Sequence, residues 1–164
     1  MPENIVTRLL CDYLIPAQVV LLLLFSLPPN PAPLRERIAA ALPFWIRCAV
    51  CIAVAVVIAR AGKVFEVWNG HPGFPSGHAN LAFAVATCMA LARSGKWALW
   101  SYLLAFAMLP SLVFHGAHDI PEVLGGATTG TVIPALVWWG ITKYGWDRKL
   151  PTTPPTKTST GGRI

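Results

Sequence analysis

The sequence predicts an all-α protein, a polytopic bundle of about five transmembrane helices. Three observations support this prediction. Only 12% of the 164 residues are charged, roughly half the share of about 25% that is typical of soluble domains. Hydrophobic residues make up 55% of the chain, and the mean hydropathy is +0.56. Five apolar segments reach, or nearly reach, the length of about 20 residues that a helix needs to cross a bilayer.

Polar or proline-rich breaks separate these apolar segments. The first covers residues 5–27 and is expected to be an uncleaved span, because no clear signal-peptide cleavage site follows it. Prolines between residues 28 and 33 end it, and residues 34–41 are predicted to form a short interfacial helix. The other spans are predicted at residues 42–60, 77–92, 97–114 and 121–141. Residues 1–142 then form a single transmembrane domain, followed by a basic, disordered cytoplasmic tail at residues 143–164.

The basic residues predict the orientation of these spans. Five spans place ten of the thirteen Lys and Arg residues on the face that also holds the C-terminus. Cytoplasmic loops carry the excess of Lys and Arg, so this face is expected to be cytoplasmic and the histidine-containing loops to lie outside. A protein of this kind suits a bacterial inner membrane, with its site facing the periplasm.

The net charge of +6 does not by itself indicate nucleic acid. The basic residues flank apolar segments, where they suit anionic lipid headgroups, so we expect membrane lipids as partners and no nucleic acid. The sequence does not indicate an oligomeric state. The four cysteines lie within apolar segments without the spacing of a zinc site, which is typical of inert packing residues.

Two loops on the predicted outer face contain most of the candidate catalytic residues. They hold all four histidines and three of the seven acidic residues. Ionisable groups near membrane depth are costly and are usually functional. The residues are His71, His78, His115, His118, Glu66, Asp119 and Glu122.

The first loop ends in Pro75-Ser76-Gly77-His78, directly before a predicted helix. A helix N-terminus presents unpaired N–H groups and a positive dipole, which suit a phosphate group. Gly77 permits close approach of the backbone, and Ser76 can donate a hydrogen bond. The alternative is that Ser76 is simply the N-cap of a structural helix.

The second loop contains His118 and Glu122, which lie one helical turn apart if a helix begins near His118. A carboxylate at this position can bind one imidazole nitrogen and leave the other free as a nucleophile. The alternative is a pair of ordinary polar residues at a helix N-terminus.

Together the two loops resemble the type 2 phosphatidic acid phosphatase family, which also includes vanadium haloperoxidases. The family pattern has three parts. The first is a lysine, six residues and Arg-Pro; the second is the tetrapeptide Pro-Ser-Gly-His; the third is Ser-Arg, five residues, a histidine, three residues and an aspartate. The tetrapeptide is intact at residues 75–78. Ser111 and His118 match the third part in spacing. The first part is degraded, because Lys63 is followed by seven residues and then His71-Pro72.

The chain departs from the family pattern at three positions. Gly70 and Leu112 stand where the family has arginines, and Glu122 stands where it has aspartate. Neither glycine nor leucine replaces the bidentate fork of a guanidinium. His71 and His115, if protonated, are expected to compensate in part.

The resemblance implies an integral membrane hydrolase that acts on the phosphomonoester or pyrophosphate of an amphiphilic lipid. It implies a phosphohistidine on His118, orientation of that histidine by Glu122, and proton transfer by His78. No metal or other cofactor is needed in this scheme. The residues implied to hold the phosphate are Lys63, Ser76, Gly77, His71 and His115.

Two alternatives compete with this interpretation. One is a membrane metalloprotein, because His115, His118 and Glu122 have a spacing that can place ligands on one helical face, with His71 and His78 completing the site. The other is a catalytically degenerate relative that binds or transfers a phospholipid, which the two missing arginines favour.

Overall fold

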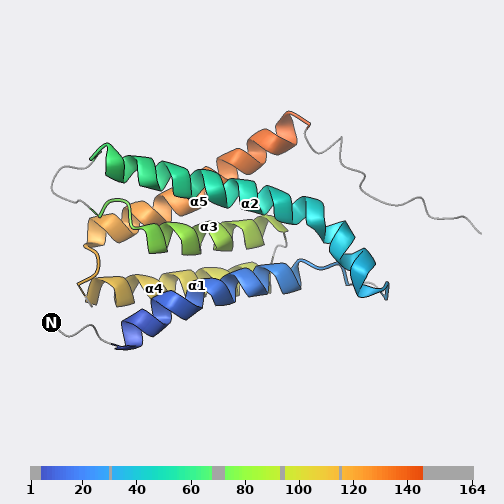
Figure 1. Ribbon diagram of the computed structural model, residues 1–164, viewed down its shortest axis with the longest axis horizontal. Coiled ribbons are helices and arrows are strands. Elements are labelled where there is room, and N and C mark those ends of the chain that lie inside the picture. The colour runs from blue at the N-terminus through green and yellow to red at the C-terminus, as the bar shows by residue number, and fades with distance from the viewer. Residues whose placement is uncertain (1–4, 30, 68–72, 93–94, 115, 146–164) are drawn as a thin grey trace, which may run out of the picture.

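The computed structural model consists of five helices, and the prediction of an all-α fold is confirmed (Figure 1). It describes residues 5–29, 31–67, 73–92, 95–114 and 116–145, and within these ranges there is no β-strand. The helices are α1 (Ile5–Phe25), α2 (Leu34–Val64), α3 (Gly77–Ala92), α4 (Lys96–Phe114) and α5 (Ile120–Lys143).

Helix α3 lies at the centre of the bundle and contacts each of the other four helices. Most of its residues are buried, and Ala79, Ala82 and Ala86 have no exposed surface. Its 16 residues span only about 24 Å at 1.5 Å per residue. A helix enclosed by its neighbours meets little lipid, so it does not have to match the full thickness of the bilayer.

Small residues on α5 allow it to pack directly against α3. A Cβ atom at Gly130 would collide with the backbone carbonyl oxygen of Asn80, and one at Gly126 would collide with the carbonyl oxygen of Ser76. The Asn80 side chain also donates a hydrogen bond of 2.9 Å to Thr129 Oγ1. The glycine pair therefore serves close packing of helices within the chain.

The prediction of a separate interfacial helix at residues 34–41 is wrong, because α2 runs without a break from Leu34 to Val64. Pro43 lies inside it, and Figure 1 shows α2 changing direction in its N-terminal part. Proline removes one backbone hydrogen bond and bends a helix, but the helix can continue on both sides of the bend.

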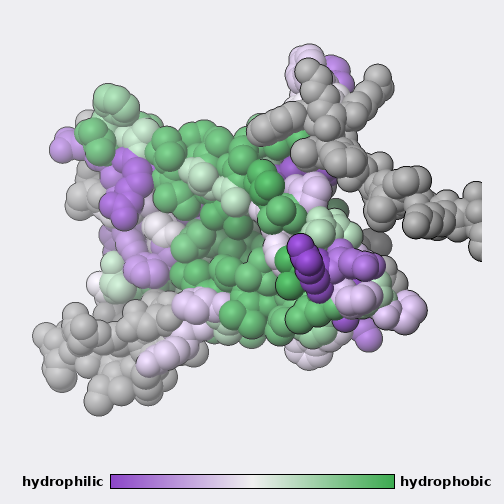
Figure 2. Space-filling view, turned by 45° about the vertical axis from the view of Figure 1, so that its right-hand side comes forward, coloured by the Kyte–Doolittle hydropathy of each residue, from purple (hydrophilic) through white to green (hydrophobic). Residues whose placement is uncertain are grey.

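The surface of the bundle fits a membrane environment. Figure 2 shows a broad hydrophobic band between two hydrophilic ends. Three helices, α2, α4 and α5, are long and apolar enough to cross a bilayer, whereas the apolar stretches Tyr13–Phe25 and Gly77–Leu91 are shorter. Large apolar side chains such as Val57, Phe106 and Leu136 are exposed on these three helices. This arrangement is consistent with an integral membrane protein.

Two core clusters fill the bundle. The first includes Ala79, Ala82, Met108, Leu112 and Val123. The second contains Cys48, Cys51 and Cys88 together with larger apolar side chains. These three cysteines are free and buried, in agreement with a packing role.

Candidate active site

The turn between α4 and α5 positions His118. Gly116 has a φ of +67°, a left-handed conformation that glycine adopts without strain. The N–H groups of Ala117 and His118 both donate to the carbonyl oxygen of Leu112 at 3.1 Å. The last turn of α4 therefore holds His118 in a defined place directly before α5.

Glu122 lies in the first turn of α5 and is 5% exposed. Its Oε2 atom is 2.7 Å from His118 Nδ1 and accepts a longer hydrogen bond of 3.4 Å from the Asp119 N–H. Its Oε1 atom accepts the Gly73 N–H at 2.9 Å. An ionised carboxylate only accepts hydrogen bonds, so Nδ1 carries the proton and the Nε2 atom of the neutral imidazole keeps a free lone pair.

The same glutamate anchors the segment before α3. Its backbone carbonyl oxygen accepts the Ser76 N–H at 2.9 Å. Ser76 in turn caps α3, because its Oγ atom accepts the Ala79 N–H at 3.4 Å. The two loops that the sequence singled out are thus joined through one residue.

This connection brings the second histidine to the first. The rings of His78 and His118 lie with their centroids 6.3 Å apart and their planes at 61°. His78 is the second residue of α3, so the start of this helix and both imidazoles share one end of the bundle.

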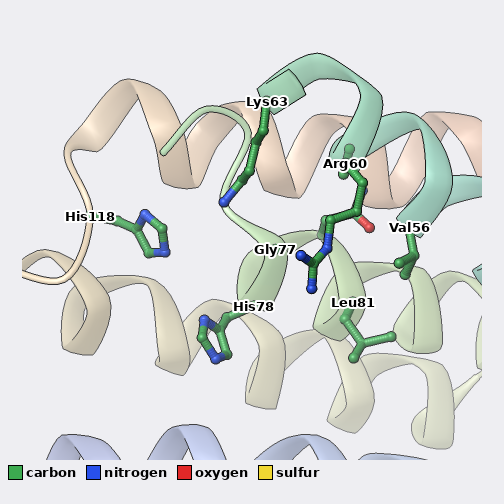
Figure 3. Close-up of a pocket in the computed structure, with 9 residues that line it drawn as sticks. Val56, Arg60, Lys63, Gly77, His78, Leu81 and His118 are labelled. Carbon is green, nitrogen blue, oxygen red and sulfur yellow. The ribbon is translucent and has the colours of Figure 1, made fainter. Parts of the chain in front are cut away.

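A cavity of about 340 Å³ opens between α2, α3 and His118. Figure 3 shows the two imidazoles on one side of it and the long side chains of Lys63 and Arg60 extending from α2 on the other. Apolar side chains continue the wall along α2 and α3. The lining residues are Val56, Ala59, Arg60, Lys63, Gly77, His78, Asn80, Leu81 and His118.

The family model of the PAP2 superfamily matches residues 58–146, which is more than half of the chain. The chain belongs to the PAP2 superfamily. This confirms the resemblance drawn from the sequence. Membership of the superfamily supports a hydrolase that acts on phosphate esters. Comparison with curated proteins and with solved structures gives no match.

Most of the residues that match the PAP2 pattern lie around the cavity. His118, His78, Gly77 and Lys63 line it, and Glu122 lies behind His118. Ser76 is buried with no exposed surface and is not among the lining residues. Its structural contribution is the cap on α3, and direct phosphate contact by its hydroxyl group stays a prediction.

Other positions of the PAP2 pattern lie elsewhere. Leu112, at the place of a family arginine, is 1% exposed and packs in the apolar core. His71, His115 and Gly70 lie outside the described residues. Among the residues that the structure describes, no three His, Cys, Asp or Glu side chains form a group that could hold a metal ion.

Arg60 is a cavity residue that the sequence analysis treated only as a topology signal. It lies three residues before Lys63 on α2, and this spacing puts both side chains on one helical face. The i, i+3 relationship to the motif lysine was the available signal. This spacing puts the two side chains on one face only if the helix continues past residue 60 to include Lys63.

Proposed function

We propose that this protein is an integral membrane lipid phosphate phosphatase that works through a phosphohistidine on His118. The observation that supports this most directly is the bond between His118 Nδ1 and Glu122, which leaves Nε2 available at the wall of a cavity shared with His78. Nucleophile, orienting group and proton donor are then present together in a PAP2 chain.

The first step would transfer the phosphoryl group to the protein. His118 Nε2 attacks phosphorus in line, an N–P bond forms, and the P–O bond to the leaving group breaks. Protonated His78 gives its proton to the departing alkoxide, or to the lipid monophosphate when the substrate is a pyrophosphate. Glu122 stabilises the positive charge that develops on the His118 ring.

The second step would restore the protein. His78, now neutral, accepts a proton from a water molecule, and the water oxygen attacks the phosphorus of phospho-His118. The N–P bond breaks and inorganic phosphate leaves. Lys63 and the first N–H groups of α3 supply positive charge to the phosphoryl oxygens in both steps.

The wall of the cavity favours an amphiphilic substrate. The apolar residues Val56 and Ala59 precede Lys63 on α2, and Leu81 follows His78 on α3. All three therefore lie farther from the loop between these helices than the charged residues do. A phosphate headgroup would sit among the charged side chains while the adjoining apolar part of the lipid contacts these residues. With the orientation predicted from the basic residues, the site faces the outside of a bacterial inner membrane and the C-terminus lies in the cytoplasm.

The decisive experiment measures inorganic phosphate released by detergent-purified protein from a panel of lipid phosphates and pyrophosphates, with and without EDTA. Wild-type protein is expected to release phosphate in EDTA, and the His118→Ala variant is expected to release none. Circular dichroism of both proteins checks that the variant is folded. Release abolished by EDTA would favour a metal site instead.

Phosphate binding without turnover would favour a degenerate phospholipid-binding relative. Leu112 supports keeping this alternative, because its apolar side chain cannot contribute the charge that the family places there.

A further inference from the structure

The PAP2 pattern holds its phosphate with guanidinium groups that this chain lacks at the usual places. Leu112 replaces one arginine and is 1% exposed within the apolar core, in contact with neither water nor the cavity. Gly70 replaces the other and has no side chain. Lys63 is then the only cation of the pattern that lines the cavity within the described part of the chain. The ammonium group of lysine is a point charge on a flexible stem, so it orients a phosphate less well than the planar guanidinium of arginine does.

Arg60 places a guanidinium in the same cavity from a different position in the chain. It precedes Lys63 by three residues on α2, so the two side chains leave the helix on one face. Both residues line the cavity together with Gly77, His78 and His118. Figure 3 shows the side chains of Arg60 and Lys63 both extending from α2 toward the cavity that Gly77 and His118 also line.

Among the residues that the structure describes, no acidic side chain neutralises the charge of this pair. No Asp or Glu is among the residues that line the cavity. Across the described ranges, neither Arg60 nor Lys63 forms an ion pair. Two cations with no acidic partner among the described residues, beside the start of a helix, make the cavity positively charged, which a phosphoryl group would complement.

We propose that Arg60 is a phosphate-binding residue of this site and supplies the guanidinium that the PAP2 pattern places elsewhere. This inference rests on the proposed function for its role in hydrolysis, but the binding of a phosphoryl group can be measured separately. The guanidinium holds phosphoryl oxygens from the α2 side, while Lys63 and the N–H groups of α3 hold them from the His118 side.

The test measures binding of inorganic phosphate by calorimetry and the KM for lipid phosphate hydrolysis in the same detergent. Arg60→Gln is expected to weaken phosphate binding and raise KM by about tenfold or more, the range for a lost charge-assisted hydrogen bond. Arg60→Lys keeps the charge without the fork and is expected to fall between wild type and Arg60→Gln. Arg35→Gln removes an exposed arginine at the other end of α2 and is expected to leave both values unchanged.

The outcomes separate this inference from the proposed function. Arg60 is exposed, so its replacement is not expected to disturb folding, and circular dichroism verifies this. Hydrolysis with unchanged KM and unchanged phosphate affinity in Arg60→Gln would overturn the role of Arg60 alone. Loss of phosphate affinity in a protein that hydrolyses nothing would uphold the binding role and reject the hydrolase. Wild-type protein that binds no inorganic phosphate would overturn the inference.

Discussion

Glu122 is bonded to His118 through an Oε2–Nδ1 contact of 2.7 Å, and the same residue accepts backbone N–H groups from Gly73 and Ser76. Glu122 thus orients His118 through its carboxylate. Its carboxylate and its backbone carbonyl also hold the segment that leads into α3. Two of these three contacts, those from Gly73 and Ser76, join residues about 50 positions apart in the sequence.

Replacing Glu122 with glutamine is expected to lower kcat by about a hundredfold or more, because a neutral amide no longer fixes the His118 tautomer or stabilises the imidazolium. KM is expected to change little, since Glu122 lies behind the histidine and does not line the cavity. Steady-state release of phosphate over a range of substrate concentrations gives both constants. Glu36→Gln, an exposed glutamate at the far end of α2, is the matched control. An unchanged kcat in Glu122→Gln would exclude the orienting role.

A side chain at Gly73 is expected to displace the Glu122 carboxylate, because a Cβ atom there would collide with it. Gly73→Ala should push the carboxylate away from His118 and lower kcat by about tenfold or more, in the same direction as Glu122→Gln. The measurement is phosphate release at saturating substrate. Gly140→Ala adds the same methyl group to α5 where nothing lies within 4 Å and should behave as wild type. Equal activity of the two alanine variants would show that the Glu122 position is not critical.

Much of the fold follows from the sequence, because the lengths of the apolar segments and the prolines between them are local signals. The bounds predicted for α3 agree with the structure, since the segment before it ends in Pro-Ser-Gly and Ser76 caps the first turn. The break predicted after residue 41 is wrong because α2 continues through Pro43, which bends the helix without ending it.

The site shows the same division between local and tertiary information. The pairing of His118 with Glu122 was predictable from their spacing, and α5 begins at Ile120, two residues after His118, as that prediction required. The bond from Gly73 to Glu122 was not, because it depends on how α3 and α5 pack. Arg60 was counted only among the basic residues that set the orientation, because its i, i+3 spacing from Lys63 does not by itself distinguish a cation that faces a cavity from one that meets lipid headgroups.

Restoring the family arginine at position 112 is not expected to improve the enzyme. Leu112→Arg would bury a charge among Ala79, Ala82 and Met108, so the free energy of unfolding should fall by more than about 4 kcal/mol. Denaturation followed by circular dichroism measures this change, and Leu112→Met, which conserves volume, should cost less than about 1.5 kcal/mol. A stable Leu112→Arg variant with higher activity would mean that the arginine reaches the site after all.

The role of His78 can be resolved by changing the leaving group of the substrate. An alkyl phosphate needs a proton on its departing oxygen, so His78→Ala should slow its hydrolysis by about 10²–10⁴-fold. An aryl phosphate such as 4-nitrophenyl phosphate leaves without a proton, so its first step should survive in the same variant. Activation of water would still be lacking, so phospho-His118 should accumulate after a burst of nitrophenol and be visible by mass spectrometry as one added phosphoryl group. His118→Ala should give neither burst nor adduct. Equal losses for both substrates, with no adduct in His78→Ala, would remove His78 from both proton transfers and leave it only a structural place beside His118.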